Sequence, residues 1–214
     1  MSNLEQALGS VKASIKTARL VAVSKTVTAE VIQEVYDCGQ RLFGENRIDV
    51  LMEKVATLPS DIEWHFIGNI QSRQIKNIVA NSCFIHSVDC LDKITKIDNA
   101  CKNQQKRINY LLQVNVSGEE VKSGFSIEEA RAAIKVAIET KHADCVGLMT
   151  MAPFVAEESE LRQVFIDLRQ LRDALEEEFD FKLPELSMGM SNDYRLALEE
   201  GATLVRVGSA IFNS

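Results

Sequence analysis

The sequence predicts a (β/α)₈ barrel, in which eight parallel strands, each followed by a helix, close into a ring. Short runs rich in Val, Ile, Leu and Phe alternate eight times with longer amphipathic stretches, a pattern typical of parallel strands buried on both faces. The 214 residues fall near the lower end of the usual length of such barrels, roughly 200 to 250 residues. Because no linker is visible, we expect residues 1–214 to form a single domain.

The predicted elements alternate regularly along the chain. The strands are expected at residues 20–24, 41–43, 63–67, 83–87, 109–116, 144–149, 185–188 and 203–207. The helices between them are expected at residues 29–38, 47–58, 71–80, 91–104, 127–140, 157–179 and 193–200. A doubly wound open sheet is the weaker alternative, because the first strand turn lacks G-x-G-x-x-G and no edge strand is polar.

Two helical stretches carry further expectations. Residues 157–179 place Leu, Val and Phe at three- and four-residue spacing, so one stripe is expected to pack on the sheet while the other faces water. A partner-binding or membrane-surface helix is the other interpretation of this stretch. The segment after the last strand, 208–214, is too short for a full outer helix. We expect the apolar positions of residues 4–18 to cover that gap, because closure places strands one and eight side by side.

Composition and charge exclude several classes of protein. With 46% hydrophobic and 26% charged residues, the chain is neither disordered nor fibrous. The net charge of -7 repels phosphate backbones and anionic membranes, so neither nucleic acid nor a membrane is an expected partner. No apolar run approaches the roughly 18 residues of a membrane span, and the N-terminus does not resemble a secretory leader. We therefore expect a cytoplasmic protein.

The cysteines and histidines do not form a metal-binding pattern. The five cysteines are odd in number and include no C-x-x-C pair, which favours reduced, partly buried thiols over disulfides or zinc. His65, His86 and His142 are isolated in the sequence. A metal centre would need carboxylates brought in by the fold, and no metal is expected.

Barrel proteins carry their functional groups at the carboxyl ends of the strands, and the first strand runs directly into Lys25. One interpretation is a partly desolvated lysine whose pKa falls, which makes it a nucleophile able to form an imine with an aldehyde. The other is an exposed lysine at the start of the loop that precedes the next helix. Position alone does not decide between them.

Strands two and three each end in glycine followed by a hydrogen-bonding side chain, Asn46 in the first case. Asn46 either orients a ring substituent or the lysine, or caps the helix that follows, and taken alone the cap is favoured. His65 falls inside strand three, so a hydrogen-bonded core histidine is the favoured interpretation.

The loops after strands seven and eight predict an anion site. They contain Ser187, Ser191, Gly208 and Ser209, which offer hydroxyl groups and backbone amides. In (β/α)₈ barrels a phosphate site is often built from these two loops. Ordinary turn and cap chemistry explains each serine singly, but explains both loops together less readily.

Arg206 lies within the apolar eighth strand, two residues before Gly208. The alternation of side chains along a strand therefore directs it into the barrel. A buried arginine requires an acceptor. Either a carboxylate of the protein or a ring nitrogen or phosphate of a ligand is expected to fill that role.

The chain resembles the pyridoxal phosphate homeostasis protein family over nearly its whole length. The similarity lies in V-A-V-S-K-T at 21–26, F-G-E-N at 43–46, W-H-F-I-G-N-I-Q at 64–71, K-S-G-F at 122–125, G-L-M-T-M at 147–151, S-M-G-M-S at 187–191 and V-R-V-G-S-A-I-F at 205–212. The motifs keep the family's order. One departure is the stretch 72–76, S-R-Q-I-K, where the family often has an Asn-Lys pair, and the chain also stops slightly earlier than many members.

The resemblance implies a barrel like the N-terminal domain of alanine racemase, fold type III among pyridoxal phosphate proteins. It implies pyridoxal 5′-phosphate held as an internal aldimine on Lys25. It further implies phosphate contacts from Ser191, Gly208 and Ser209, with Ser187 nearby, a pyridine-nitrogen contact from Arg206, and Asn46 and His65 lining the site.

The role that the resemblance implies is intracellular vitamin B6 homeostasis, in which the protein holds the cofactor and passes it to apoenzymes. The alternative is an amino-acid racemase, but the tyrosines Tyr36, Tyr110 and Tyr194 read as parts of helices or strands rather than as a second base. An arginine opposite the pyridine nitrogen also weakens the electron sink that carbanion chemistry needs. A barrel for another phosphorylated metabolite is a third hypothesis. Barrel packing accounts for every amphipathic face, so we expect a monomer. Because no second base is evident, we expect no enzyme activity.

Overall fold

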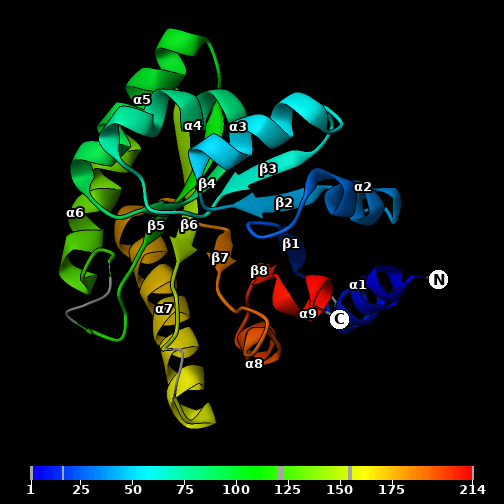
Figure 1. The fold of residues 1–214 in the computed structure, drawn as a ribbon. Helices are drawn as coiled ribbons and strands as arrows, with labels where there is room; N and C mark the ends of the chain where they lie inside the picture. Colours follow the sequence, from blue (N-terminus) through cyan, green and yellow to red (C-terminus); the bar gives the residue numbers. More distant parts are fainter. Residues whose placement is uncertain (1, 16, 120–122, 154–155, 214) are drawn as a thin grey trace.

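In a computed structural model that describes residues 2–15, 17–119, 123–153 and 156–213, eight parallel strands close into a barrel (Figure 1). They are β1 (Arg19–Val23), β2 (Leu42–Glu45), β3 (Glu63–Phe66), β4 (Phe84–Val88), β5 (Ile108–Gln113), β6 (Ala143–Met149), β7 (Glu185–Ser187) and β8 (Leu204–Val207). The strands follow one another in chain order, and β8 pairs with β1. The predicted (β/α)₈ fold is confirmed.

The helices lie around the outside of the barrel (Figure 1). They are α1 (Asn3–Ser14), α2 (Ala29–Asp37), α3 (Ile48–Thr57), α4 (Ile75–Asn81), α5 (Leu91–Gln104), α6 (Ile127–Ile138), α7 (Glu158–Phe179), α8 (Tyr194–Glu199) and α9 (Ser209–Phe212), with a 3₁₀ turn η1 (Ser72–Gln74) before α4. Among the helices described, none combines the length and apolarity needed to cross a membrane.

Most strand boundaries lie within one or two residues of the prediction, and β5 differs most. It ends at Gln113 rather than extending to 116. Beyond that point the backbone turns to the following loop, where Asn115 N donates to Phe125 O and Phe125 N donates to Gln113 O. Lys122, the first residue of the K-S-G-F motif, lies outside the described residues.

Two separate sets of apolar side chains stabilise the barrel. The larger set lies between the sheet and the helices, and its members on α7 are Val164, Phe165, Leu168, Leu171 and Leu175. This confirms that residues 157–179 pack one stripe on the sheet. A smaller cluster of Val21, Phe84, Leu111, Met149 and Leu204 comes from five different strands. Side chains that meet from so many strands fill the interior of a closed barrel.

The seam between β8 and β1 is covered by the N-terminal helix. Helix α1 packs against α9, the single helical turn that follows β8 (Figure 1). Its buried residues Leu8 and Val11 belong to the main core. The prediction that the N-terminal stretch replaces a full outer helix after strand eight is therefore confirmed.

Candidate functional site

The predicted site residues gather on four neighbouring strands. Lys25 follows β1, Asn46 follows β2, Ser187 ends β7 and Arg206 lies in β8. In the sheet β7 pairs with β8, β8 with β1, and β1 with β2. All of these strands run in one direction, so their carboxyl ends meet at one rim of the barrel. The fold thus brings the residues predicted from the sequence to one half of that rim.

Lys25 stands in an exposed turn directly after β1. The residue before it, Ser24, is buried and held on three sides. Its N–H donates to Gly44 O at 3.0 Å, its carbonyl accepts from Lys54 Nζ at 2.9 Å, and its hydroxyl donates to Glu45 Oε1 at 2.6 Å. The start of the Lys25 turn is therefore fixed, while the lysine itself is exposed rather than partly desolvated. The exposure arises because Lys25 lies beyond the last residue of the β1 ladder.

A buried ion pair lies behind this turn, between the sheet and α3. Lys54 Nζ lies 2.7 Å from Glu45 Oε1, and the two side chains are 8% and 0% exposed. The second carboxylate oxygen, Glu45 Oε2, is buried and has no hydrogen-bond partner among the described residues. We name Ser24, Glu45 and Lys54 the β1 clamp. Sequence reasoning missed it, because a lysine in an amphipathic helix is ordinarily expected to face solvent.

Asn46 is exposed at the rim and does not cap the next helix. That helix, α3, begins at Ile48 with Arg47 as its N-cap, and the cap makes no side-chain hydrogen bond. The favoured prediction of a capping asparagine is wrong, because the helix starts one residue too late for it. The backbone of Asn46 is fixed by Gly68 at the end of β3. A Cβ on Gly68 would lie 1.9 Å from Asn46 O, so only glycine fits there.

The loops after β7 and β8 are joined by Ser191. Its Oγ accepts hydrogen bonds from Gly208 N at 3.2 Å and Ala210 N at 3.3 Å. The β7 loop is itself held by Asp193, whose Oδ1 accepts from Met190 N at 2.5 Å. Burial raises the pKa of the Asp193 carboxyl, against the opposing effects of that bond and of Arg206. The two loops predicted to build an anion site thus meet through a hydroxyl and backbone N–H groups.

Arg206 points into the barrel, as its alternation predicted, and is 5% exposed. The sequence predicted either a carboxylate of the protein or an atom of a ligand as its acceptor, and the acceptors observed are neither. Nη1 donates to Ser187 Oγ at 2.6 Å and Nη2 donates to Thr150 O at 2.9 Å. Burial lowers the pKa of Arg206 to about 10, with Asp193 acting in the other direction. Among the described residues, the guanidinium is therefore held by neutral acceptors and not by a carboxylate.

Ser187 connects Arg206 to two histidines in the barrel interior. Its Oγ lies 2.8 Å from His86 Nδ1, and His86 Nε2 lies 2.8 Å from His65 Nδ1. Burial lowers the pKa of His65 to about 3 and lowers that of His86 well below its ordinary value. The prediction that His65 is a hydrogen-bonded core histidine is confirmed. His86 was missed, although it alternates with the buried Phe84 on β4 and so shares its inward face.

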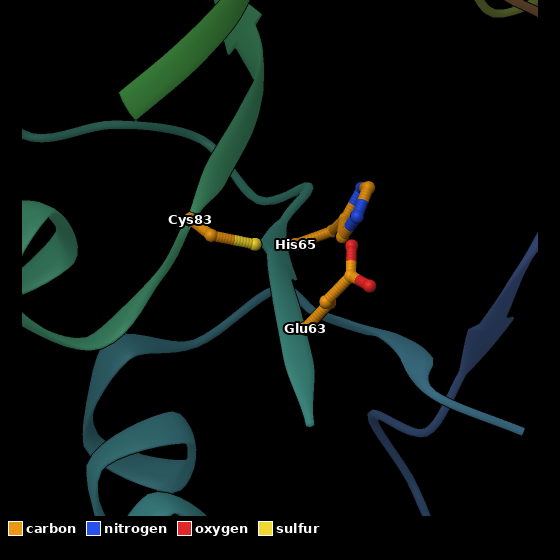
Figure 2. A group of neighbouring side chains, drawn as sticks. All are labelled: Glu63, His65 and Cys83. Atoms are coloured by element: carbon orange, nitrogen blue, oxygen red, sulfur yellow. The ribbon is translucent and has the colours of Figure 1, made fainter. Parts of the chain in front are cut away.

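The fold also brings Glu63 and Cys83 near His65, with potential ligand atoms within 4.8 Å of one another. Figure 2 shows the Glu63 carboxylate against the His65 ring on one side of β3 and the Cys83 sulfur on the other side. Sγ of Cys83 lies 3.4 Å from the carbonyl oxygen of Trp64, and burial raises the pKa of the thiol to about 11. The sulfur is turned towards the Trp64 carbonyl, so we assign no metal to this group.

Comparison with known proteins identifies relatives over the whole chain. The family model of the alanine racemase N-terminal domain matches residues 1–214. The pyridoxal phosphate homeostasis protein of Aquifex aeolicus is 39% identical over 196 residues, which cover 91% of this chain and 86% of the relative. The human protein of that name is 37% identical over 207 residues, which cover 91% of this chain and 75% of the relative.

Solved structures agree with these matches. PipY of Synechococcus elongatus, solved without and with PLP, superposes with TM-scores of 0.94 and 0.92 at 33% and 32% identity, covering 98% of this chain and 99% of PipY. Alanine racemase from Corynebacterium glutamicum has a TM-score of 0.81 at 14% identity, covering 98% of this chain and 60% of that one. The second likeness shows a common barrel fold.

Proposed function

Because the chain belongs to the alanine racemase N-terminal domain family, and within it to the pyridoxal phosphate homeostasis proteins, we propose that it binds pyridoxal 5′-phosphate at the carboxyl end of its barrel. In this proposal it holds the cofactor for vitamin B6 homeostasis. The relative PipY has been solved with PLP bound and shares 32% of its residues with this chain, which supports the assignment.

The single observation that carries the proposal is the junction of the loops after β7 and β8. There the Ser191 hydroxyl oxygen accepts from the backbone N–H groups of Gly208 and Ala210, which gathers one hydroxyl and two amides where the loops meet, and a bound phosphate would take the place of that oxygen as their acceptor. Hydroxyl and amide donors are what a phosphate needs. We assign the phosphate to Ser191, Gly208 and Ser209. Glycine at position 208 lets the loop backbone lie close to β1, because a Cβ there would be 3.1 Å from Val23 O.

Arg206 fits the ring nitrogen of the same cofactor. A guanidinium has five N–H donors and no acceptor, and Ser187 and Thr150 accept from two of them. A donor opposite the ring nitrogen requires that nitrogen to be unprotonated. We propose that Ser187, whose hydroxyl is engaged with Arg206 and His86, acts on the cofactor through Arg206. Asn46 is assigned to the rim of the site, and His65 to its interior support.

Lys25 is the residue that we assign to covalent attachment. Its ε-amino group is exposed at the rim, and the β1 clamp fixes the backbone immediately before it. When bound, the cofactor supplies an aldehyde, with which the amine condenses and releases water. The lysine must lose its proton before it attacks, and its exposure lets solvent accept that proton.

The environment of the three tyrosines favours a protein that holds the cofactor over an enzyme that racemises amino acids. Tyr36 OH donates to Asp61, Tyr194 OH shares a hydrogen bond with Ser14, and Tyr110 is fully buried in β5. Two of the hydroxyl groups are engaged in these hydrogen bonds and the third is buried, so none is free to act as a second base beside Lys25. An unprotonated ring nitrogen opposite Arg206 also disfavours carbanion chemistry. A racemase-like enzyme is the second candidate, favoured by the fold it shares with alanine racemase.

The experiment that tests the cofactor site uses the visible absorption spectrum, before and after borohydride, of wild type, Lys25→Ala and the exposed-lysine control Lys182→Ala. We expect a yellow band that borohydride bleaches in wild type and in the control. Peptide mass mapping is expected to locate the cofactor on Lys25. Absence of the band after added pyridoxal phosphate would refute the assignment and favour a barrel for another phosphorylated metabolite.

Turnover is tested separately on the loaded protein. We expect no interconversion of amino-acid enantiomers above that of the Lys25→Ala variant, measured by chiral chromatography. Lys25-dependent racemisation would establish the enzyme alternative. We further propose that the protein is a cytoplasmic, single-domain monomer that delivers its cofactor to apoenzymes. Its exposed large apolar residues are spread over the surface, which supports the monomer: Met52 lies on α3, Leu91 on α5, Ile127 and Ile138 at the two ends of α6, and Met151 after β6.

A further inference from the structure

Four buried side chains form a continuous hydrogen-bond chain through the barrel interior. Arg206, Ser187, His86 and His65 come from β8, β7, β4 and β3. The three links between them measure 2.6, 2.8 and 2.8 Å, and each side chain is at most 5% exposed. Buried polar groups linked in series influence one another more strongly than pairs in water do.

The proton positions in this chain follow from its one permanent donor. Arg206 only donates, so Ser187 Oγ must accept from it. The single hydroxyl hydrogen of Ser187 then needs an acceptor, because the side chain is fully buried. His86 Nδ1, at 2.8 Å, is the acceptor that the described residues offer. His86 therefore carries its proton on Nε2 and donates it to Nδ1 of His65.

The position of the proton on His65, at the far end of the hydrogen-bond chain, follows by the same reasoning. His65 accepts at Nδ1 and is neutral, so it carries its own proton on Nε2. The Glu63 carboxylate lies beside this ring at the amino end of β3 (Figure 2), with an oxygen within 4.8 Å of a ring nitrogen. Every donor in the three links thus points away from Arg206, from β8 through β7 and β4 to His65 on β3.

We propose that Arg206, Ser187, His86 and His65 form a one-way hydrogen-bond chain in which Ser187 and His86 are positioning residues for Arg206. This inference rests on the proposed cofactor site, since it concerns the group assigned to the ring nitrogen. The chain fixes the guanidinium without neutralising it, because hydroxyl and imidazole acceptors carry no charge. The full positive charge of Arg206 remains available to the ligand, and a carboxylate in the place of Ser187 would remove that advantage.

The direction of the chain is tested first, on the full-length protein without added cofactor. Nitrogen-15 spectra of histidine-labelled protein distinguish the two neutral tautomers. We expect His65 and His86 both to carry the proton on Nε2, with resonances assigned by comparison with His65→Gln and His86→Asn. A proton on Nδ1 of His86 would overturn the one-way chain. This readout does not depend on pyridoxal phosphate, so it separates this inference from the proposed function.

The positioning role is tested with two variants of His86 that keep opposite halves of the ring. The amide oxygen of His86→Asn falls near the position of Nδ1 and still accepts from Ser187. His86→Gln places its amide near the position of Nε2 and leaves the Ser187 hydroxyl without an acceptor. Circular dichroism and thermal melting confirm that both variants fold. Asparagine is the smaller residue, so a purely structural role of His86 would make it the worse substitute.

We therefore expect His86→Asn to retain the cofactor affinity and absorption band of wild type. We expect His86→Gln to bind pyridoxal phosphate at least about tenfold more weakly, as for a buried hydroxyl left without an acceptor, with a shifted band. Equal behaviour of the two folded variants, or a larger loss in His86→Asn, would overturn the positioning role. A wild type without the borohydride-sensitive band would instead refute the proposed function.

Discussion

Replacing Lys54 by methionine is expected to destabilise the protein strongly. Methionine preserves most of the volume of the side chain but leaves the fully buried Glu45 without its cation. Glu45 Oε2 already has no hydrogen-bond partner among the described residues, so the carboxylate then depends on the Ser24 hydroxyl alone. Removing one partner of a buried pair costs about 3 to 5 kcal/mol. For a chain of this size that corresponds to a fall in Tm of roughly 6 to 20 °C.

Urea unfolding, followed by circular dichroism and tryptophan fluorescence, measures the loss in Lys54→Met. The matched control is Arg131→Met, which breaks the exposed pair of Arg131 with Glu178, whose side chains are 40% and 44% exposed. An exposed pair contributes about 0 to 1 kcal/mol. The double variant Glu45→Leu, Lys54→Met removes both charges and is expected to regain much of the stability. A cost in Lys54→Met no larger than that of Arg131→Met would refute the reasoning.

Two other perturbations follow from the structure. Gly68→Ala is expected to cost several kcal/mol of stability and to weaken cofactor binding, because its Cβ would lie 1.9 Å from Asn46 O. The control in thermal melting is Gly9→Ala, whose Cβ would have no atom within 4 Å. Equal effects of the two substitutions would contradict the close contact. The second perturbation is a change of pH. Burial lowers the pKa of His65 from 6.5 to about 3, so between these pH values the unfolded chain binds more protons than the folded protein does. The free energy of unfolding therefore falls as the pH decreases from 6.5 towards 3. Wild type is expected to lose up to about 1.4 kcal/mol per pH unit more than His65→Gln in this range, and parallel unfolding curves between them would exclude the effect.

The fold and the meeting of the candidate site residues at one rim were predictable because both depend on local pattern and topology. Apolar runs of strand length identified the barrel, and its topology placed residues such as Lys25 and Ser191 at one rim. The inward direction of Arg206 followed from the alternation of side chains along a strand. These features depend on positions close together in the sequence, or on rules that hold for every barrel of this type.

The polar contacts behind the site were not predictable in the same way. Lys54 lies nine positions from Glu45, and only the packing of α3 on β2 turns it inward to a carboxylate. His86 looked isolated because its partners, His65 and Ser187, are separated from it by 21 and 101 positions. The neutral acceptors of Arg206 include the backbone carbonyl of Thr150, which no side-chain pattern reveals. Such contacts become visible only when the barrel closes.

The β1 clamp also determines how the first strand is aligned with the second. A slip of β1 by one residue would exchange the two faces of the strand, so that Lys25 would occupy the place of Ser24 beside Glu45. That carboxylate is already paired with the ammonium group of Lys54, so a second ammonium group there would leave one positive charge buried without a counter-ion. The slipped alignment is therefore penalised by charge, while the native one places an uncharged hydroxyl on the carboxylate and keeps Lys25 at the rim.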